Sequence, residues 1–109
     1  TAACCMVKAK DFQAVSGFDE DLAIAYNDVD LCARIHDQLG KDNVWAHEAE
    51  LYHFESVTRG SDAKDKQKRA RLERESEVFR CKHVEAVEND PYYNPNLSRT
   101  SGNFWIRED

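Results

Sequence analysis

One carboxylate in this sequence is placed where it could accept a proton from a substrate. Residues 28–39 repeat apolar side chains at helical spacing between a favourable N-cap, Asn27, and a helix-stopping Gly40, so the pattern predicts a helix. Asp28 lies in its first turn, where the helix dipole favours the ionised carboxylate and the backbone is rigid. Such a group can act as a general base. The residues alone equally allow Asp28 to do no more than support the start of the helix.

A second aspartate, Asp30, is expected on another face of the same helix. Asp28 precedes Cys32 by four residues and therefore lies at the end of the buried stripe. Asp30 precedes Arg34 by four residues, a spacing at which opposite charges pair on a helix surface. We therefore expect an exposed ion pair, although their places beside the candidate base keep Asn27 and Asp30 among the candidate substrate-binding residues.

A histidine in a predicted strand is the candidate metal ligand. Residues 43–47 and 50–55 are short and rich in Val, Trp, Tyr and Phe, which favours strands, and Trp45 is expected in the core. In the second strand His53 and Glu55 share a side, so the imidazole could bind Mn²⁺ or Mg²⁺ while the carboxylate joins or orients it. A histidine among aromatic residues is also commonly a packed, hydrogen-bonded side chain, and both interpretations stay open.

Three further side chains could contact a substrate. Arg59 follows the second predicted strand and could reach diphosphate oxygens as a bidentate donor, or simply remain in solvent. Tyr92 and Tyr93 lie in the proline-containing loop 89–96, where they could close over a nucleotide or a sugar. Aromatic residues in such a loop also serve to anchor it to the domain.

The remaining elements place these residues in a single domain that spans 1–109. Asp11 can cap a short helix, which Gly17 would end because glycine tolerates the left-handed conformation of a helix stop. Residues 61–88 are dense in charge, which predicts a long helix covered by solvent. Residues 89–109 are expected to form a tail that docks back onto the domain.

The composition excludes several classes of protein. The chain has 109 residues, of which 41% are hydrophobic and 33% charged, as expected for one globular domain. Its net charge of −6 disfavours nucleic-acid binding. No apolar run is long enough for a membrane span or resembles a secretory leader, so we expect a cytoplasmic protein. The four cysteines lack the spacing of a zinc site, which predicts free, mostly buried thiols.

Several segments together resemble a known enzyme family. In chain order they are 17–20 (GFDE), 26–32 (YNDVDLC), 50–56 (ELYHFES), 59–60 (RG) and 90–97 (DPYYNPNL). Their order and separation are similar to those in the C-terminal, acceptor-side portion of the catalytic domain of family-two inverting glycosyltransferases, which have the GT-A fold. Each segment is weak evidence by itself, but the set covers nearly the whole chain.

The resemblance implies roles for individual residues. The family's catalytic base is the second residue of an acidic pair, which matches Asp28, whereas Asn27 stands where the family usually has Glu or Asp. His53 matches a histidine that completes the coordination of a divalent cation in some of these enzymes. The resemblance thus implies a nucleotide-diphosphate sugar as donor, a sugar or lipid-linked acceptor, and Mn²⁺ or Mg²⁺ as cofactor, in the synthesis of a bacterial cell-surface polysaccharide.

The resemblance also implies a fold. It predicts an α/β domain, the C-terminal part of a GT-A fold, with a small sheet and three helices of which the last is long; residues 1–60 would hold the acceptor and the base. The family's nucleotide-binding half, with its Asp-x-Asp motif after a strand, has no counterpart in this sequence. We therefore expect little or no transferase activity from this chain alone, and self-association through an exposed sheet edge and apolar surface.

An alternative function is a non-catalytic binding module. The acidic face around Asp19, Asp21, Asp28 and Asp30 could hold a cation or a basic partner without any reaction. This module is not an EF-hand, because the mid-loop glycine and the terminal glutamate of that motif are not correctly spaced here.

Overall fold

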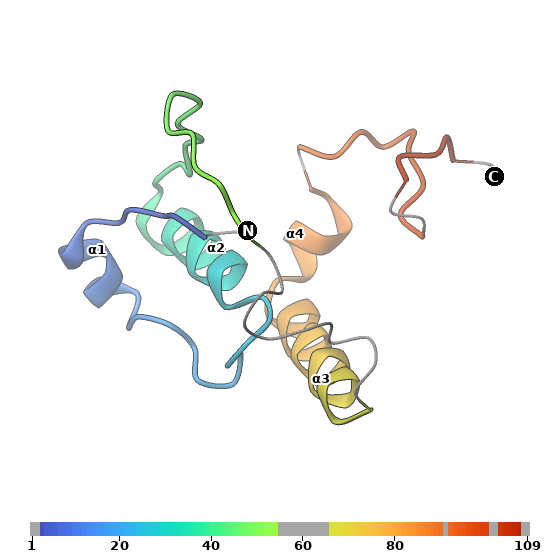
Figure 1. The fold of residues 1–109 in the computed structure, drawn as a ribbon, viewed down its shortest axis with the longest axis horizontal. Helices are drawn as coiled ribbons and strands as arrows, with labels where there is room; N and C mark the ends of the chain where they lie inside the picture. Colours follow the sequence, from blue (N-terminus) through green and yellow to red (C-terminus); the bar gives the residue numbers. More distant parts are fainter. Residues whose placement is uncertain (1–2, 55–65, 91, 101–102, 108–109) are drawn as a thin grey trace.

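The computed structural model describes residues 3–54, 66–90, 92–100 and 103–107, and within them the chain is helical (Figure 1). In chain order the helices are α1 (Ala9–Ala14), α2 (Asn27–Leu39), α3 (Lys66–Lys82) and α4 (Val84–Glu88). No helix in these ranges has the length and apolar character needed to cross a membrane.

The short helix α1 forms where it was predicted, but the residues that begin and end it differ from the prediction. Asp11 does not cap it, because the N-cap is Lys8 and Asp11 lies inside the helix, where its buried carboxylate pairs with Lys41. At the other end the helix finishes at Ala14, and the first left-handed residue after its C-cap is Ser16, with a φ of 63°; Gly17 follows with a φ of 71°. The predicted cap is therefore wrong, and Ser16 takes the stop position that was predicted for Gly17.

The helix α2 matches its predicted range to within one residue. Gly40 has a φ of 61°, and its N–H bonds to the carbonyl of His36 at 2.9 Å, which confirms it as the stop. The residue before the helix is Tyr26, with a left-handed φ of 62°, so Asn27 is the first helical residue and not the N-cap. A left-handed tyrosine is uncommon and has to be held by its neighbours.

A small apolar core joins α1 and α2. It consists of buried Val15, Leu31 and Ile35, with the partly buried Phe12 and Leu39 packed against them. Burial of these side chains is the main force that holds the two helices together, because apolar burial contributes roughly 25 cal/mol per Å².

The long charged helix is shorter than predicted and less exposed. Within the described residues α3 begins at Lys66 and breaks at His83, after which α4 is a separate helix. Glu75 and Phe79 are buried on α3, so the helix is not simply covered by solvent. Residues 61–65 of the predicted helix lie outside the described residues.

The predicted small sheet is absent from the described residues. The bridge between Leu97 and Ile106 is isolated, and residues 41–54 have no helix or strand, only a turn in which Ala49 N–H bonds to Ala46 C=O at 3.1 Å. The α/β prediction is therefore wrong for the part of the chain described here. The physical reason is that a strand needs a neighbouring strand to satisfy its backbone groups, and high β-propensity alone supplies none.

The same absence leaves predicted core residues in solvent. Trp45 is 86% exposed, contrary to the expectation that it lies in the core. The cysteines are free, as predicted, but Cys4, Cys5 and Cys81 are exposed, and only Cys32 is partly buried. The tail folds on itself near its bridge, with Trp105 exposed, and its docking stays a prediction.

Candidate functional site

The candidate base Asp28 lies in the first turn of α2, as predicted. Its side chain is partly buried, and Oδ1 accepts a hydrogen bond from the N–H of Val29 at 2.9 Å. Asn27, beside it, is also partly buried. Two sets of contacts hold this turn in place. One set is made by Asp30, and the other by residues 24–26, which precede the helix.

Asp30 is wholly buried and is the centre of an ion cluster. Oδ2 accepts from Arg34 Nε at 2.7 Å, while Oδ1 lies 2.8 Å from Lys82 Nζ and 2.9 Å from His83 Nε2. Burial alone raises the pKa of this carboxyl, but the hydrogen bonds from Lys82, His83 and Arg34 outweigh it and lower the pKa to about 2. The predicted pair with Arg34 is confirmed, whereas its predicted exposure is wrong because the end of α3 covers this face.

The cluster ties Asp30 to the connection between α1 and α2 as well as to α3. Besides Asp30, the guanidinium of Arg34 donates to the carbonyls of Val15 and Gly17, the latter at 2.7 Å. The ammonium of Lys82 also pairs with Asp19. These contacts lower the pKa of Asp19, chiefly through the hydrogen bond from Lys82.

Glu75 of α3 holds the backbone immediately before α2. Its side chain is completely buried, and Oε2 accepts from the N–H of Ala25 at 2.6 Å and of Ile24 at 3.3 Å. The ring of Tyr26 stacks on Phe79 of α3, with centroids 5.1 Å apart. The left-handed Tyr26 is thereby fixed from both sides.

Together these contacts make α3 a support for the first turn of α2. It touches the backbone before Asp28 through Glu75, the helix start through Phe79, and the turn itself through Lys82 and Asp30. The sequence analysis missed this role. A stripe was nevertheless visible in the charged run, since Glu75, Phe79 and Lys82 recur at helical spacing of four and three.

The predicted metal ligand, His53, does not belong to a group of ligands among the described residues. His53 is exposed in segment 41–54, where the neighbouring rings of Tyr52 and Phe54 have centroids 6.4 Å apart. No three His, Cys, Asp or Glu side chains gather into a cation site among the residues that the structure describes. Glu55 and Arg59 lie outside the described residues, so their predicted roles stay predictions.

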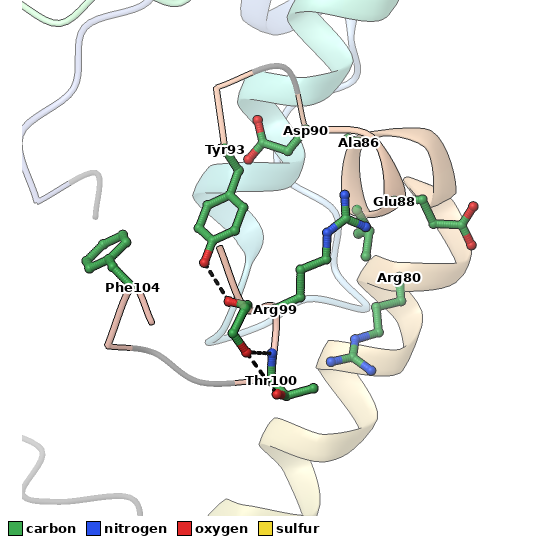
Figure 2. Close-up of a pocket in the computed structure, with 10 residues that line it drawn as sticks. Arg80, Ala86, Glu88, Asp90, Tyr93, Arg99, Thr100 and Phe104 are labelled. Carbon is green, nitrogen blue, oxygen red and sulfur yellow. Dashed lines mark hydrogen bonds between the residues drawn. The ribbon is translucent and has the colours of Figure 1, made fainter. Parts of the chain in front are cut away.

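The two tyrosines that were predicted to contact a substrate line two different cavities. Tyr92 is 92% exposed and lines a cavity between α2 and α4. Tyr93 lines a second cavity of about 680 Å³, together with Arg80 and Arg99. Figure 2 shows this second cavity, in which the hydroxyl of Tyr93 donates to the carbonyl of Ser98 at 2.7 Å. That bond ties Tyr93 to a neighbouring part of the tail, so the two roles that the sequence allowed for Tyr93 both stay predictions.

Comparison with known proteins places this chain within much longer sequences. It is 41% identical over 105 residues to an uncharacterized protein, y4gI, of Sinorhizobium fredii, a match that covers 95% of this chain and 11% of the relative. It is 31% identical over 107 residues to the O-antigen biosynthesis protein RfbC of Myxococcus xanthus, covering 98% of this chain and 8% of the relative. No family model and no solved structure matches. The chain thus spans about a tenth of the length of these curated relatives, and along nearly all of its own length it is similar to part of an O-antigen biosynthesis protein.

Proposed function

We propose that this chain is the acceptor-side part of an inverting glycosyltransferase, with Asp28 as the general base. The protein would move a sugar from a nucleotide-diphosphate donor to an acceptor hydroxyl. The similarity to an O-antigen biosynthesis protein supports this class, because O-antigen is a polysaccharide and its assembly requires sugar transfer. The resemblance of segment 26–32 to the family's acidic motif supports the residue.

The observation that carries the proposal is that two nearby aspartates, Asp28 and Asp30, have different surroundings. Asp30 is fully buried and already accepts from Arg34, Lys82 and His83, so it has no capacity for a substrate proton. Asp28, two residues earlier, is only partly buried and lies on a turn that α3 holds in place. Environment thus separates a structural carboxylate from one that can meet a substrate.

The reaction is a single displacement. The acceptor oxygen attacks the anomeric carbon while the bond from that carbon to the donor phosphate breaks, and the nucleoside diphosphate leaves with the bonding electrons. Asp28 takes the proton of the acceptor hydroxyl, which increases the nucleophilicity of its oxygen. A rigid position matters here because a general base must lie within hydrogen-bond reach of the proton.

The residues described do not by themselves fit a divalent cation. His53 stays a predicted ligand, but no cluster of three ligands exists among the described residues to complete its coordination. We therefore derive no step through a metal. The leaving diphosphate needs positive charge, for which Arg59 stays the proposed donor in this chain.

The structure disfavours the alternative of an acidic binding module. Two of the four carboxylates that would form its face, Asp19 and Asp30, are already paired with Lys82, and Asp30 is inaccessible. A basic partner would have to displace these internal cations.

The test is turnover by the protein in its natural length. Uridine-, guanosine- and thymidine-diphosphate sugars would be assayed with Mn²⁺, and Asp28→Asn compared with Asp42→Asn, a matched change at a residue whose side chain is 83% exposed. We expect Asp28→Asn to lower kcat by about 10²–10⁴-fold and the control to leave it unchanged. Unaltered turnover in Asp28→Asn removes Asp28 as the base, and no turnover with any donor favours the binding module.

A further inference from the structure

A cavity of about 630 Å³ lies between α2 and the junction of α3 with α4. It reaches Val29, the residue after the proposed base, and extends to Tyr92 beyond α4. Figure 1 shows α4 continuing from the end of α3, and residues of α2, α3 and α4 line the cavity. The volume is within the range of small-molecule sites, roughly 300–1,000 Å³.

A buried histidine lines the cavity, and the reaction proposed above does not use it. His83 is 7% exposed, its ring lies 4.9 Å from that of Phe79, and its Nε2 is 2.9 Å from Asp30 Oδ1. The carboxyl group of Asp30, with a pKa of about 2, is ionised near neutral pH and can only accept hydrogen bonds. The hydrogen of this bond therefore lies on Nε2 of His83. Any contact between the His83 ring and a ligand in the cavity must therefore use Nδ1.

The chemistry of Nδ1 selects the ligand group. With Nε2 protonated, Nδ1 accepts a hydrogen bond when the ring is neutral and donates one when the ring is charged. A hydroxyl group can serve as donor or acceptor and so suits both states. An amine suits only the neutral ring, and a carboxylate or phosphate only the charged one.

The rest of the lining favours a neutral, hydroxyl-rich molecule. The nearly fully exposed ring of Tyr92 offers an apolar face, and the side-chain amides of Asn43 and Asn89 also line the cavity. Three carboxylates accompany them, from Asp37, Glu85 and Asp90. The one ammonium, that of Lys82, is already paired with two aspartates, so the cavity repels a nucleotide diphosphate.

We propose that this cavity binds a saccharide and that, on the transferase function proposed above, this saccharide is the acceptor. Tyr92 covers a C–H face of a sugar ring, and His83, oriented by Asp30, contacts a hydroxyl. Val29, the residue after Asp28 in the first turn of α2, lines the cavity, which is why we assign the saccharide to the acceptor.

The experiment measures binding and does not require turnover. Saturation-transfer difference NMR on the protein in its natural length would use a mixture of the methyl glycosides of glucose, galactose, mannose, N-acetylglucosamine and rhamnose. Excess uridine diphosphate would be present to occupy a donor site. We expect transfer to at least one glycoside, and about tenfold weaker binding of it in Tyr92→Ala.

A matched control identifies the cavity. Tyr52→Ala removes an equally exposed tyrosine that does not line this cavity, and it should leave the signal unchanged. In long-range ¹H–¹⁵N spectra the glycoside should shift the Nδ1 resonance of His83, and His83→Gln should weaken binding. No transfer to any glycoside, equal losses in the two tyrosine variants, or displacement of the glycoside by uridine diphosphate would overturn the proposal.

The outcomes separate this inference from the proposed function. Asp28→Asn should lower kcat by about 10²–10⁴-fold and retain glycoside binding. If no donor supports turnover while the Tyr92-dependent binding persists, the saccharide site stands and the transferase function fails.

Discussion

The carboxylate of Glu75 and the backbone N–H of Ala25 lie 2.6 Å apart across 50 positions of sequence. Together with the bond from the N–H of Ile24, this bond connects α3 to the backbone before the proposed catalytic turn. Glu75 is wholly buried, and loss of its carboxylate would leave two partly buried backbone N–H groups without their acceptor. The helix α3, whose sequence predicts a solvent-exposed helix, therefore helps to hold the site in place.

Replacement of Glu75 should destabilise the protein. We expect Glu75→Ala to lower the free energy of unfolding by about 1–3 kcal/mol, since it removes two hydrogen bonds and leaves two partly buried backbone donors without their acceptor. Glu73→Ala, on an exposed position of the same helix, should change it by less than about 0.5 kcal/mol. Urea unfolding of both variants checks this, and equal midpoints would show that the bond contributes nothing.

Stability should fall in acid because of Asp30. Its pKa in the folded protein is about 2, below the ordinary 3.8, so the unfolded chain binds more protons between these values. The stabilisation is complete above pH about 4 and is lost as the pH falls to about 2, an effect on the order of 2 kcal/mol. Denaturation curves between these pH values measure it. An equally steep acid loss in Asp30→Asn would assign the effect to other groups.

Arg34 should not tolerate replacement by lysine. Its guanidinium reaches Asp30 and the carbonyls of Val15 and Gly17 at once, a fork that a single ammonium cannot reproduce. We expect Arg34→Lys to cost about 1–3 kcal/mol despite the unchanged charge. The comparison is Arg80→Lys, an exposed arginine of α3, and a similar midpoint for both variants would contradict the fork.

The two left-handed glycines should differ in their response to alanine. A Cβ at Gly40 meets no atom within 4 Å, so Gly40→Ala should cost only the conformational term, about 1 kcal/mol. A Cβ at Gly17 lies 3.1 Å from the ring of Phe12, so Gly17→Ala adds a steric term. Thermal unfolding should rank Gly17→Ala below Gly40→Ala, and the reverse order would refute this account of the turn.

The chain should self-associate through its exposed apolar segments. Trp45, Leu51, Tyr52 and Phe54 all lie in the unpaired stretch 41–54 with most of their surface in water. We expect sedimentation equilibrium at high concentration to give a mass above the 12.6 kDa of one chain. Leu51→Lys with Phe54→Lys should shift the distribution toward one chain, and a single-chain mass for the unaltered protein would exclude the expectation.

The sequence predicted what depends on local spacing. The helix α2 and its stop at Gly40 follow from a periodic apolar stripe and a glycine, both of which act within a few residues. The burial of Asp30 was not predictable in this way, because it depends on Lys82 and His83, 52 and 53 positions away. The local spacing to Arg34 revealed one partner out of three.

The predicted strands failed for a related reason. Residues 43–47 have the composition of a strand, but a strand exists only when a second one pairs with it. Within the site, the position of Asp28 in the first turn of α2 was predictable from the sequence. The contacts of Glu75 and Phe79 with the residues before this turn were not, because they depend on how α3 packs. Tertiary contacts of this kind leave only a faint signal in a charged sequence.

The shared carboxylate of Asp30 also governs how the molecule comes apart. If α3 frayed from its C-terminal end, Lys82 would withdraw and leave the buried carboxylate of Asp30 with fewer of the partners that offset its burial. Partial opening is therefore penalised, and α2 and α3 behave as one cooperative unit despite the long separation between them in sequence. Amide hydrogen exchange along the two helices should report a common opening free energy.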